Sequence, residues 1–474
     1  MNLTPNAIHY AIEQLLVRAG CPPPERIGET RWQTAGITLD YADPAAVADA
    51  VGIIIAPCAP DAGQSLLARP PGTLETRPLT DTLPEGVALP FGERLPVLFW
   101  GEGYENHLAF VSRREDGVVV FYADLVAAAF FMLSRWEEMA LPDRDMHQRF
   151  PVESSAACKQ GFLDRPIVDE YADILREWLR TLRPDWTPQP GTFRVQLTHD
   201  IDVPLRWTFF GMTLRRMGGD LLNRRSPRMM LRSLRQGYRA WRKPDHDPTV
   251  TAYREIMRLS EANGFKSAFY FMAATPSRYD DGYDPRQQPY HRLIHEAIDR
   301  GHEIGFHPGY NTFRWLENFE AEKNRLIEAA GIPEMGGRQH YLRFSVPETW
   351  RIWEAAGMRY DSSMGYAAQE GFRCGTCHPF PPYDIEYDRP LNLIERPLIV
   401  MDATLQSYRR FSPDEGANRI MELARKCQSV NGEFVLLWHN TSLIDEWESW
   451  ADTYRRVVQQ LATMVSTADS TEDV

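Results

Sequence analysis

Short apolar segments alternate with longer helical segments after about residue 190, and this alternation constrains the fold more than any other feature. Each apolar segment has three to five residues and is typical of a buried strand. The predicted strands are 193–197, 267–271, 303–306, 337–339, 358–360, 393–395 and 434–438. Helices fit between them, for example over 249–263 and 289–300. Alternation on this scale predicts a parallel sheet, open or closed into a barrel.

Polar side chains recur at the ends of these predicted strands. Asp200 and Asp202 follow the first strand, His307 follows the third, and His439 follows the last. The other members of this set lie at the fourth to sixth strands and are Arg338, His340, Asp361 and Glu395. In parallel barrels the site forms at the carboxyl ends of the strands. We therefore expect these residues, far apart in the sequence, to converge.

The residue types in this set indicate metal and proton chemistry. Asp200 and Asp202 can share one site, where one carboxylate binds a cation and the other holds the proton of a bound water. His307 can be a metal ligand, and Asn311, four residues later, can supply a second. We interpret His439, which ends a very apolar strand, as a general acid. The structural alternatives are a turn capped by acids and a buried core histidine.

Five segments between about residues 190 and 465 resemble, in the correct order, the motifs of the polysaccharide deacetylase family (carbohydrate esterase family 4). They are Thr198-His199-Asp200-Ile201-Asp202, His302 to His307, Arg338-Gln339-His340-Tyr341, Tyr360-Asp361-Ser362-Ser363 and Leu436-Leu437-Trp438-His439. The resemblance implies an irregular barrel of the (β/α)7 type in an α/β protein. The preceding region is similar to the uncharacterised domain that precedes some deacetylases of this kind.

The resemblance also implies how an N-acylated sugar would be hydrolysed. Asp202 and His307 would hold a divalent metal, with zinc the expected ion, and the metal would lower the pKa of a bound water. Asp200 would take the proton of that water, and His439 would protonate the leaving amine.

Three further roles come from the same resemblance. Arg338 would pair with Asp200 and keep it ionised. Asp361 would orient His439. The backbone N–H of Tyr341 would stabilise the oxyanion and so contact the substrate.

The sequence departs from the family at Asn311, where the family usually has a second histidine. An amide oxygen is a poorer zinc ligand than imidazole. Four explanations stay open: Asn311 coordinates weakly, His340 replaces the missing imidazole, the metal is harder than zinc, or the site is impaired. His340 stands where the family commonly has proline.

The segment Cys374-Gly375-Thr376-Cys377-His378 fits the pattern of c-type haem attachment. Covalent haem needs an export route and an axial partner, and neither is evident in the sequence. A structural or substrate-facing loop is the favoured interpretation. Arg373 directly precedes it and is a candidate substrate contact.

The chain divides at a proline-rich stretch, residues 183–191. We expect an N-terminal α/β domain of unknown function over 1–185, a barrel over 192–465 and a disordered polar tail over 466–474. The most apolar stretch, 125–133, is about half the ~20 residues that span a membrane. No secretory signal is visible, and six scattered cysteines are typical of reduced thiols. These features favour a cytoplasmic protein.

A basic insert is predicted at about 206–243, just after the first motif. It carries a net charge of +10, so the rest of this chain of net charge −13 carries −23. Aromatic residues and methionines are interleaved with its arginines. The insert is expected to be a helical lid that meets an anionic membrane surface or a diphosphate-linked glycan. The alternative is a solvated helix that pairs with the acidic remainder of the chain.

The sequence therefore supports three functional hypotheses, ranked in order. The first is an N-deacetylase of amino sugars in bacterial surface-polysaccharide synthesis, acting on a nucleotide- or lipid-linked precursor. The second is a hydrolase of non-sugar C–N amides on the same barrel, and the third is a non-catalytic carbohydrate-binding protein with a degenerate site. The acidic net charge argues against nucleic acid as a partner.

Overall fold

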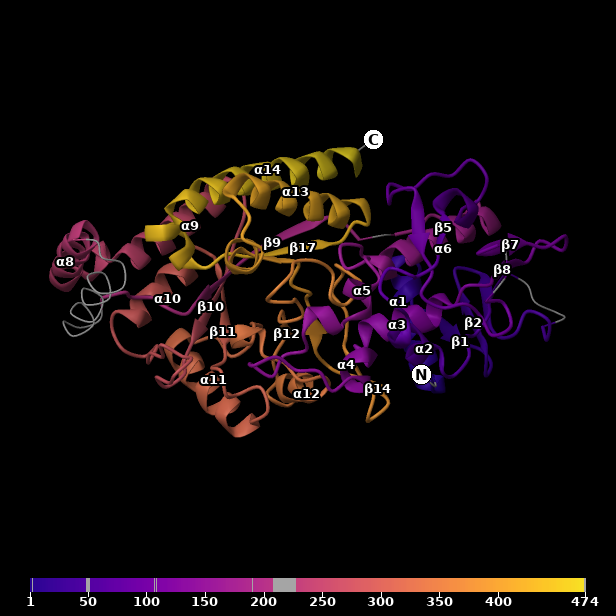
Figure 1. Cartoon of the computed structure of the whole chain (residues 1–474), viewed down its shortest axis with the longest axis horizontal. Coiled ribbons are helices and arrows are strands. Elements are labelled where there is room, and N and C mark those ends of the chain that lie inside the picture. The colour runs from indigo at the N-terminus through magenta and orange to yellow at the C-terminus, as the bar shows by residue number, and fades with distance from the viewer. Residues whose placement is uncertain are drawn as a thin grey trace. The chain divides into compact units, whose positions relative to one another are not determined.

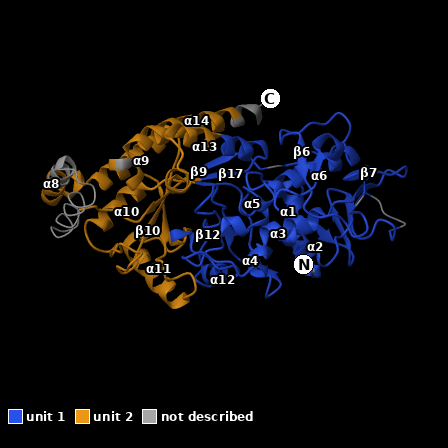
Figure 2. Cartoon of the chain, viewed as in Figure 1, with its two compact units in different colours: residues 1–195, 341–400, 422–435 blue, residues 196–340, 401–421, 436–474 orange. Residues whose placement is uncertain are grey.

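This computed structural model describes residues 1, 3–47, 52–105, 107, 109–189, 191–207 and 227–472. The fold is mixed α/β, and the chain forms two compact units (Figure 2). Unit 1 comprises residues 1–195, 341–400 and 422–435, and unit 2 comprises 196–340, 401–421 and 436–474. Each unit is therefore built from segments that are separated in the sequence. Among the described helices, none is long and apolar enough to cross a membrane.

Unit 1 contains a six-stranded sheet in the order β1-β2-β3-β4-β8-β7. Its strands are β1 (Glu25–Arg26), β2 (Arg31–Thr34), β3 (Ile37–Tyr41), β4 (Gly52–Ile55), β7 (Val111–Arg113) and β8 (Val119–Phe121). Strands β7 and β8 pair antiparallel and form a hairpin around Glu115-Asp116-Gly117. A second antiparallel pair joins β5 (Thr76–Pro78) to β6 (Arg94–Pro96).

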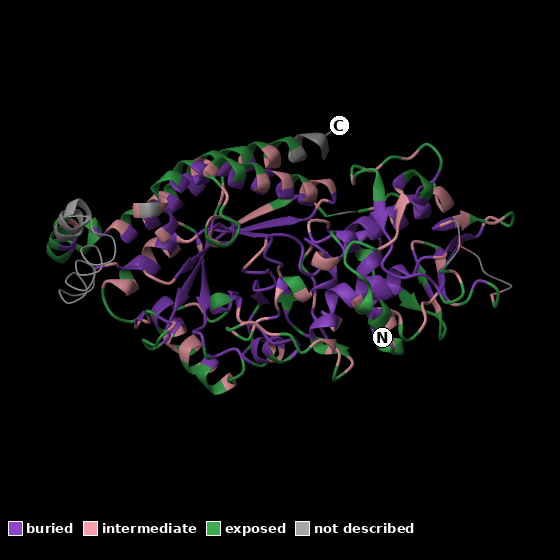
Figure 3. Ribbon diagram, viewed as in Figure 1, coloured by how far each residue is buried: buried purple, intermediate pink, exposed green. Residues whose placement is uncertain are grey.

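The helices of unit 1 surround a very apolar core helix. All nine residues of α3 (Leu125–Leu133) are buried, and Asp124 Oδ1 caps it by accepting the N–H of Ala127 at 2.8 Å. The other helices from the N-terminal half are α1 (Pro5–Arg18), α2 (Ala62–Ala68), α4 (Trp136–Ala140), α5 (Ala156–Lys159) and α6 (Ile167–Leu182). Both α1 and α6 pack against α3 (Figure 1). The burial of this helix on all sides explains its uniform hydrophobicity (Figure 3).

Residues 341–400, expected in the barrel, instead belong to unit 1. They form α12 (Glu348–Ala355), the parallel pair β12 (Tyr360–Asp361) and β15 (Ile394–Glu395), and the antiparallel pair β13 (Tyr383–Asp384) and β14 (Arg389–Pro390). Tyr10 donates a hydrogen bond to the carbonyl of Pro381 at 2.8 Å. Such contacts between distant segments are invisible to a boundary drawn from local composition.

The other sheet has the order β11-β10-β9-β17-β16. Its strands are β9 (Arg194–Ile201), β10 (Ala268–Met272), β11 (Glu303–His307), β16 (Val400–Met401) and β17 (Glu433–Leu437). Pairing of β10 with both β9 and β11 is parallel. Every residue of β10 and β17 is buried, as expected for strands covered on both faces. Five of the described strands form this sheet, and segment 337–339 adds a bridge from Gly337 to Phe306, so closure into a barrel stays a prediction.

Helices follow the strands of this sheet on the pattern that the sequence predicts. They are α9 (Pro248–Ala262), α10 (Tyr290–Asp299), α11 (Leu316–Ala330), α13 (Pro413–Ser429) and α14 (Glu448–Glu472). A further helix, α8 (Pro227–Arg242), packs against the short 3-10 helix Pro244–His246 that follows it. Asp247 caps α9 by accepting the N–H of Thr249 at 3.0 Å, with Pro248 at the first helical position. Of the predicted insert at 206–243, residues 208–226 lie outside the described residues.

The tail expected to be disordered from residue 466 is helical as far as Glu472, because α14 continues through it. Ser466 and Thr467 donate hydrogen bonds to carbonyls four residues earlier, which lets these polar side chains stay in the helix. Residues 473 and 474 of that predicted tail lie outside the described residues.

A buried ion network in unit 1 supports a stability prediction. Glu138 accepts hydrogen bonds from Arg373 Nη2 at 2.7 Å and from Arg135 Nε at 2.8 Å, and all three side chains are buried. Glu138→Gln leaves Arg373 without its buried counter-charge, whereas Arg135 keeps Glu137, so we expect about 3–5 kcal/mol of destabilisation. Urea denaturation measures the free energy of unfolding of each variant. The control is Glu386→Gln at the partly exposed pair with Arg351, which should cost under about 1 kcal/mol. Equal losses in both variants would contradict the prediction.

Candidate active site

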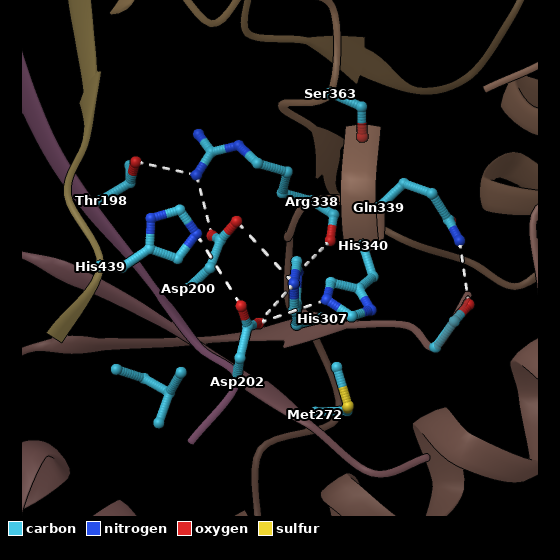
Figure 4. A network of polar contacts seen from close by, with 12 residues as sticks. Thr198, Asp200, Asp202, Met272, His307, Arg338, Gln339, His340, Ser363 and His439 are labelled. Atoms are coloured by element: carbon cyan, nitrogen blue, oxygen red, sulfur yellow. Dashed lines mark hydrogen bonds and ion pairs between the residues drawn. The ribbon is translucent and has the colours of Figure 1, made fainter. Parts of the chain in front are cut away.

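The register of the parallel strands brings the predicted polar residues to one edge of the sheet. Ile201 is paired with Phe271, and Met272 is paired with His307. Asp202 directly follows Ile201, so Asp202 and His307 lie on either side of Met272 (Figure 4). The edge formed by the carboxyl ends of these strands therefore holds the site residues, as expected for a parallel sheet.

Asp202, His307 and His340 form a group that could hold a metal ion. Their ligand atoms all lie within 4.8 Å of one another. His307 Nε2 is 3.1 Å from Asp202 Oδ1, and His340 Nε2 is 3.8 Å from the same oxygen. Among the described residues, Asp202 Oδ1 and His307 Nε2 are buried without a hydrogen-bond partner. Burying such atoms unpaired is unfavourable, and a bound cation would satisfy both.

The orientation of each imidazole fits the same conclusion. His307 Nδ1 is 2.6 Å from the carbonyl of Arg338, and His340 Nδ1 is 2.9 Å from Asp280 Oδ1. Both partners are hydrogen-bond acceptors, so each ring donates from Nδ1–H and offers the lone pair of Nε2. One carboxylate and two imidazoles are a donor set that suits zinc and related divalent ions. The donor set therefore fits a divalent cation.

The two alternatives for the third ligand differ in their environment. Asn311 is exposed, whereas His340 is buried and lies in the group with Asp202 and His307. Asp280, which the sequence analysis did not single out, orients His340 and also accepts the N–H of Tyr310 at 2.8 Å. His340, directly after the predicted strand at 337–339, is therefore the better-placed third ligand.

Asp200 lies beside this group and is bound to Arg338. Arg338 Nη1 donates to Asp200 Oδ1 and to Thr198 Oγ1, each at 3.0 Å. The other oxygen, Oδ2, is 3.8 Å from His307 Nε2. Arg338 is fully buried, with its guanidinium 5.1 Å from the ring of Tyr270. The guanidinium thus places a buried positive charge directly beside this carboxylate.

His439 is held by a carboxylate that the sequence analysis did not identify. Its Nδ1 is 2.8 Å from Asp402 Oδ1, and its backbone N–H donates to Asp402 Oδ2 at 2.9 Å. Its Nε2 is 3.9 Å from Asp202 Oδ2. Burial lowers the pKa of His439, but the charges of Asp402, Asp202 and Asp200 outweigh burial and raise that pKa to about 10. The imidazole can therefore carry a proton at neutral pH.

Asp402 replaces Asp361 in the role that the resemblance assigned. Asp361 belongs to unit 1, where Ser363 Oγ donates to its Oδ1 at 2.6 Å. Asp402 follows β16, in the apolar sequence Leu398-Ile399-Val400-Met401-Asp402. This segment shows the same sequence pattern as the strand before Asp200 and Asp202, namely an apolar run followed by an acidic residue. The resemblance directed attention to the motif around Asp361 instead.

The two predicted substrate contacts have different positions. Arg373 is only 2% exposed and is paired with Glu138, so it belongs to the buried ion network of unit 1, and its contact with a substrate stays a prediction. Tyr341 follows His340 directly and has a φ of 62°, a left-handed conformation that is uncommon outside glycine. Its carbonyl accepts a hydrogen bond from Arg149 at 3.0 Å. The role of its N–H stays a prediction.

A second group with metal-binding residue types lies in the haem-like segment. It consists of Asp169, Cys377 and His378. Asp169 already accepts hydrogen bonds from Arg18 Nε, Thr376 Oγ1 and the N–H of Cys377, at 3.1, 2.6 and 2.9 Å. A carboxylate with three donors is satisfied without a cation. The segment is therefore a buried loop fastened to α6 within unit 1, as the structural interpretation expected.

Comparisons with known proteins give limited information. Residues 85–184 match the model of a family of unknown function, DUF7033. No curated protein matches the chain. Solved structures with partial likeness include a candidate polysaccharide deacetylase from Mycobacterium smegmatis, 14% identical with a TM-score of 0.38, covering 60% of this chain and 93% of that one.

Another partial likeness is a candidate glycoside hydrolase/deacetylase from Parabacteroides distasonis. It is 14% identical with a TM-score of 0.35, and the match covers 58% of this chain and 66% of that one. At TM-scores below 0.5, neither likeness establishes a fold or a function for this chain. We therefore infer the function of this chain from the geometry of its site.

Gly337 allows the chain to approach β11 closely just before Arg338. A Cβ at this position would lie 1.9 Å from the carbonyl oxygen of Phe306, a backbone atom that cannot move aside. Gly337→Ala should displace the Arg338 carbonyl from His307 and lower zinc affinity about 10- to 100-fold, as measured by competition with a chelating dye. Gly28→Ala, where the added Cβ meets ordinary contacts, is the control. Unchanged zinc affinity in Gly337→Ala would contradict this account.

The pair formed by His439 and Asp402 predicts a titration behaviour. The Asp402 charge stabilises the protonated imidazole, so its removal lowers the pKa of His439 from about 10. In Asp402→Asn, the imidazole should therefore lose its proton at a lower pH than in the unmodified protein. NMR titration of the metal-free chain measures the shift, and Asp281→Asn at an exposed position is the control. An unchanged or higher pKa would show that Asp402 does not hold the proton.

Proposed function

We propose that this chain is a metal-dependent hydrolase that removes an N-acyl group from an amino sugar. The observation that carries the proposal is the arrangement around Asp202, His307 and His340. A proton acceptor, Asp200, and a proton donor, His439, both lie beside this candidate metal group. Hydrolysis of an amide needs both, since water must lose a proton and the leaving amine must gain one.

The first proton transfer belongs to Asp200. Asp202, His307 and His340 would hold a divalent cation, which when bound lowers the pKa of a coordinated water and polarises a carbonyl. Asp200, kept ionised by Arg338, accepts the proton of the attacking water.

The second proton transfer belongs to His439. Asp402 stabilises its protonated form and fixes the ring through Nδ1, so Nε2 delivers the proton to the departing nitrogen. The side chain of Asp202 remains 29% exposed and that of His439 is also partly exposed, which gives a substrate access to this edge.

The amino-sugar substrate rests on the resemblance of the five motifs to polysaccharide deacetylases. A hydrolase of non-sugar amides would use the same groups, and an assay decides between them. The purified zinc-loaded chain should release acetate from N-acetylglucosamine oligosaccharides and not from N-acetylated amines without a sugar. Release from the simple amides alone would favour the second hypothesis. The third hypothesis, a binding protein with a degenerate site, rests on the replacement of the usual histidine by Asn311. His340 lies where it can supply the missing imidazole, so this replacement is a weaker reason to expect a degenerate site.

Asp202→Ala removes the carboxylate whose oxygen lies near both imidazoles. We expect this variant to lose stoichiometric zinc, as measured by mass spectrometry of the metal after dialysis. Asp281→Ala, at an exposed position outside the group, should retain it. Full zinc occupancy in Asp202→Ala would place the metal elsewhere.

Asp200→Asn keeps the shape of the side chain but removes its ability to accept a proton. The variant should keep zinc and lose turnover by about 10²- to 10⁴-fold, the usual contribution of a general base. Acetate release measures the rate, and metal analysis of the same sample shows that the site is loaded. A variant that keeps zinc and full activity would exclude Asp200 as the base.

A further inference from the structure

The last turns of α8 present an unusual set of exposed side chains. Tyr238 is 58% exposed and Trp241 is 70% exposed. Four cations of the same segment are also exposed, namely Arg235, Arg239, Arg242 and Lys243. Figure 3 shows the exposed residues of this helix in green. Large aromatic side chains and cations therefore share one surface.

These four cations have no carboxylate partner among the described residues. The contacts of Arg242 are with Tyr238, whose hydroxyl is 3.3 Å from Nη1 and whose ring centre is 5.8 Å from the guanidinium. By contrast, Arg258 and Arg286, which are also exposed in unit 2, are paired with Glu255 and Asp284. These four cations therefore do not pair with the acidic remainder of the chain, which was the alternative interpretation of the basic segment.

Helical geometry separates the side chains into faces. Gly237 and Ala240 are buried and form the face that packs on the protein. Tyr238 and Trp241, three residues apart, share the next face. The arginines at 235, 239 and 242 repeat at four and three residues and share a third face. An aromatic face beside a cationic face is the pattern of helices that lie at a membrane interface.

A hollow adjoins the aromatic face. Its volume is about 360 Å³, and Trp241 forms part of its wall together with Leu205, Trp207, Ala240, Pro289 and Tyr290. The polar side chains of Asp247, Gln287 and Gln288 also line it, so the hollow is mixed in character. Trp241, which is 70% exposed, lies between this hollow and solvent, a position that suits an amphipathic ring at a lipid headgroup layer.

We propose that the C-terminal end of α8 docks on an anionic phospholipid surface. Arg235, Arg239, Arg242 and Lys243 contact the phosphates, while Tyr238 and Trp241 enter the headgroup layer. The rest of the chain outside 206–243 has a net charge of −23, so an anionic surface repels it. The protein can therefore approach such a surface only with the basic segment foremost. This partner goes beyond the proposed hydrolase activity and does not depend on it.

Sedimentation with vesicles tests the proposal on the full chain. The protein should sediment with vesicles of phosphatidylglycerol and phosphatidylcholine in equal parts, and stay in solution with phosphatidylcholine alone. Bound protein should decrease as salt rises, because screening weakens the attraction of the cations. Absence of binding to the phosphatidylglycerol vesicles, or equal binding to both kinds, would overturn the proposal.

Variants test whether α8 is the surface that binds. Arg235→Gln with Arg239→Gln and Arg242→Gln should lower the partition coefficient about 100-fold, since each cation contributes about fivefold. The matched control changes the same charge elsewhere, in Arg258→Gln with Arg286→Gln and Arg456→Gln. Circular dichroism shows that both proteins are folded. An equal loss in the control would mean that total charge, and not this surface, is responsible.

The aromatic contribution separates a lipid surface from other polyanions. Trp241→Ala should lower vesicle binding several-fold, whereas Trp315→Ala, which removes a side chain that is 64% exposed on the same unit, should not. A fluorescent DNA duplex serves as the competing polyanion. If the chain binds DNA more tightly than the vesicles, and Trp241→Ala leaves both affinities unchanged, the partner is a nucleic acid and the proposal fails.

Discussion

Two hydrogen bonds at Nδ1 of His307 and His340 determine what the candidate site can bind. The carbonyl of Arg338 and the carboxylate of Asp280 each accept a hydrogen bond from the Nδ1–H of one ring, so each Nε2 offers a lone pair toward Asp202. Without these bonds the imidazoles could rotate or change tautomer, and the group would have no fixed donor set. Arg338 serves twice, since its carbonyl orients His307 while its guanidinium pairs with Asp200.

Some residues of the candidate site are buried and fixed in position, and others are exposed to solvent. Asp200, His307 and Arg338 are buried, so their charges interact strongly and their positions are fixed. Asp202 and His439 retain exposure, and these are the residues that would meet a substrate. The parallel register aligns the ends of β9 and β11, and this alignment places the buried and the exposed site residues next to one another without a long loop.

The sequence predicts the strands that carry the site, because buried strands are short apolar runs and polar residues at their ends are conspicuous. It does not predict which carboxylate reaches His439, since Asp361 and Asp402 both follow apolar segments and only tertiary packing distinguishes them. The burial of Arg373 was not predictable for a related reason: a lone arginine beside a polar loop gives no sign in the sequence of a buried partner such as Glu138, 235 residues earlier.

The interleaving of the two units has a consequence for how the chain acquires its structure during synthesis. Asp169 leaves the ribosome more than two hundred residues before its partners Thr376 and Cys377 exist. Until then its carboxylate and the apolar α1–α3–α6 core lack the segment that completes them. The nascent N-terminal half therefore emerges with apolar surface that the later segment covers, and exposed surface of this kind favours association between incomplete chains.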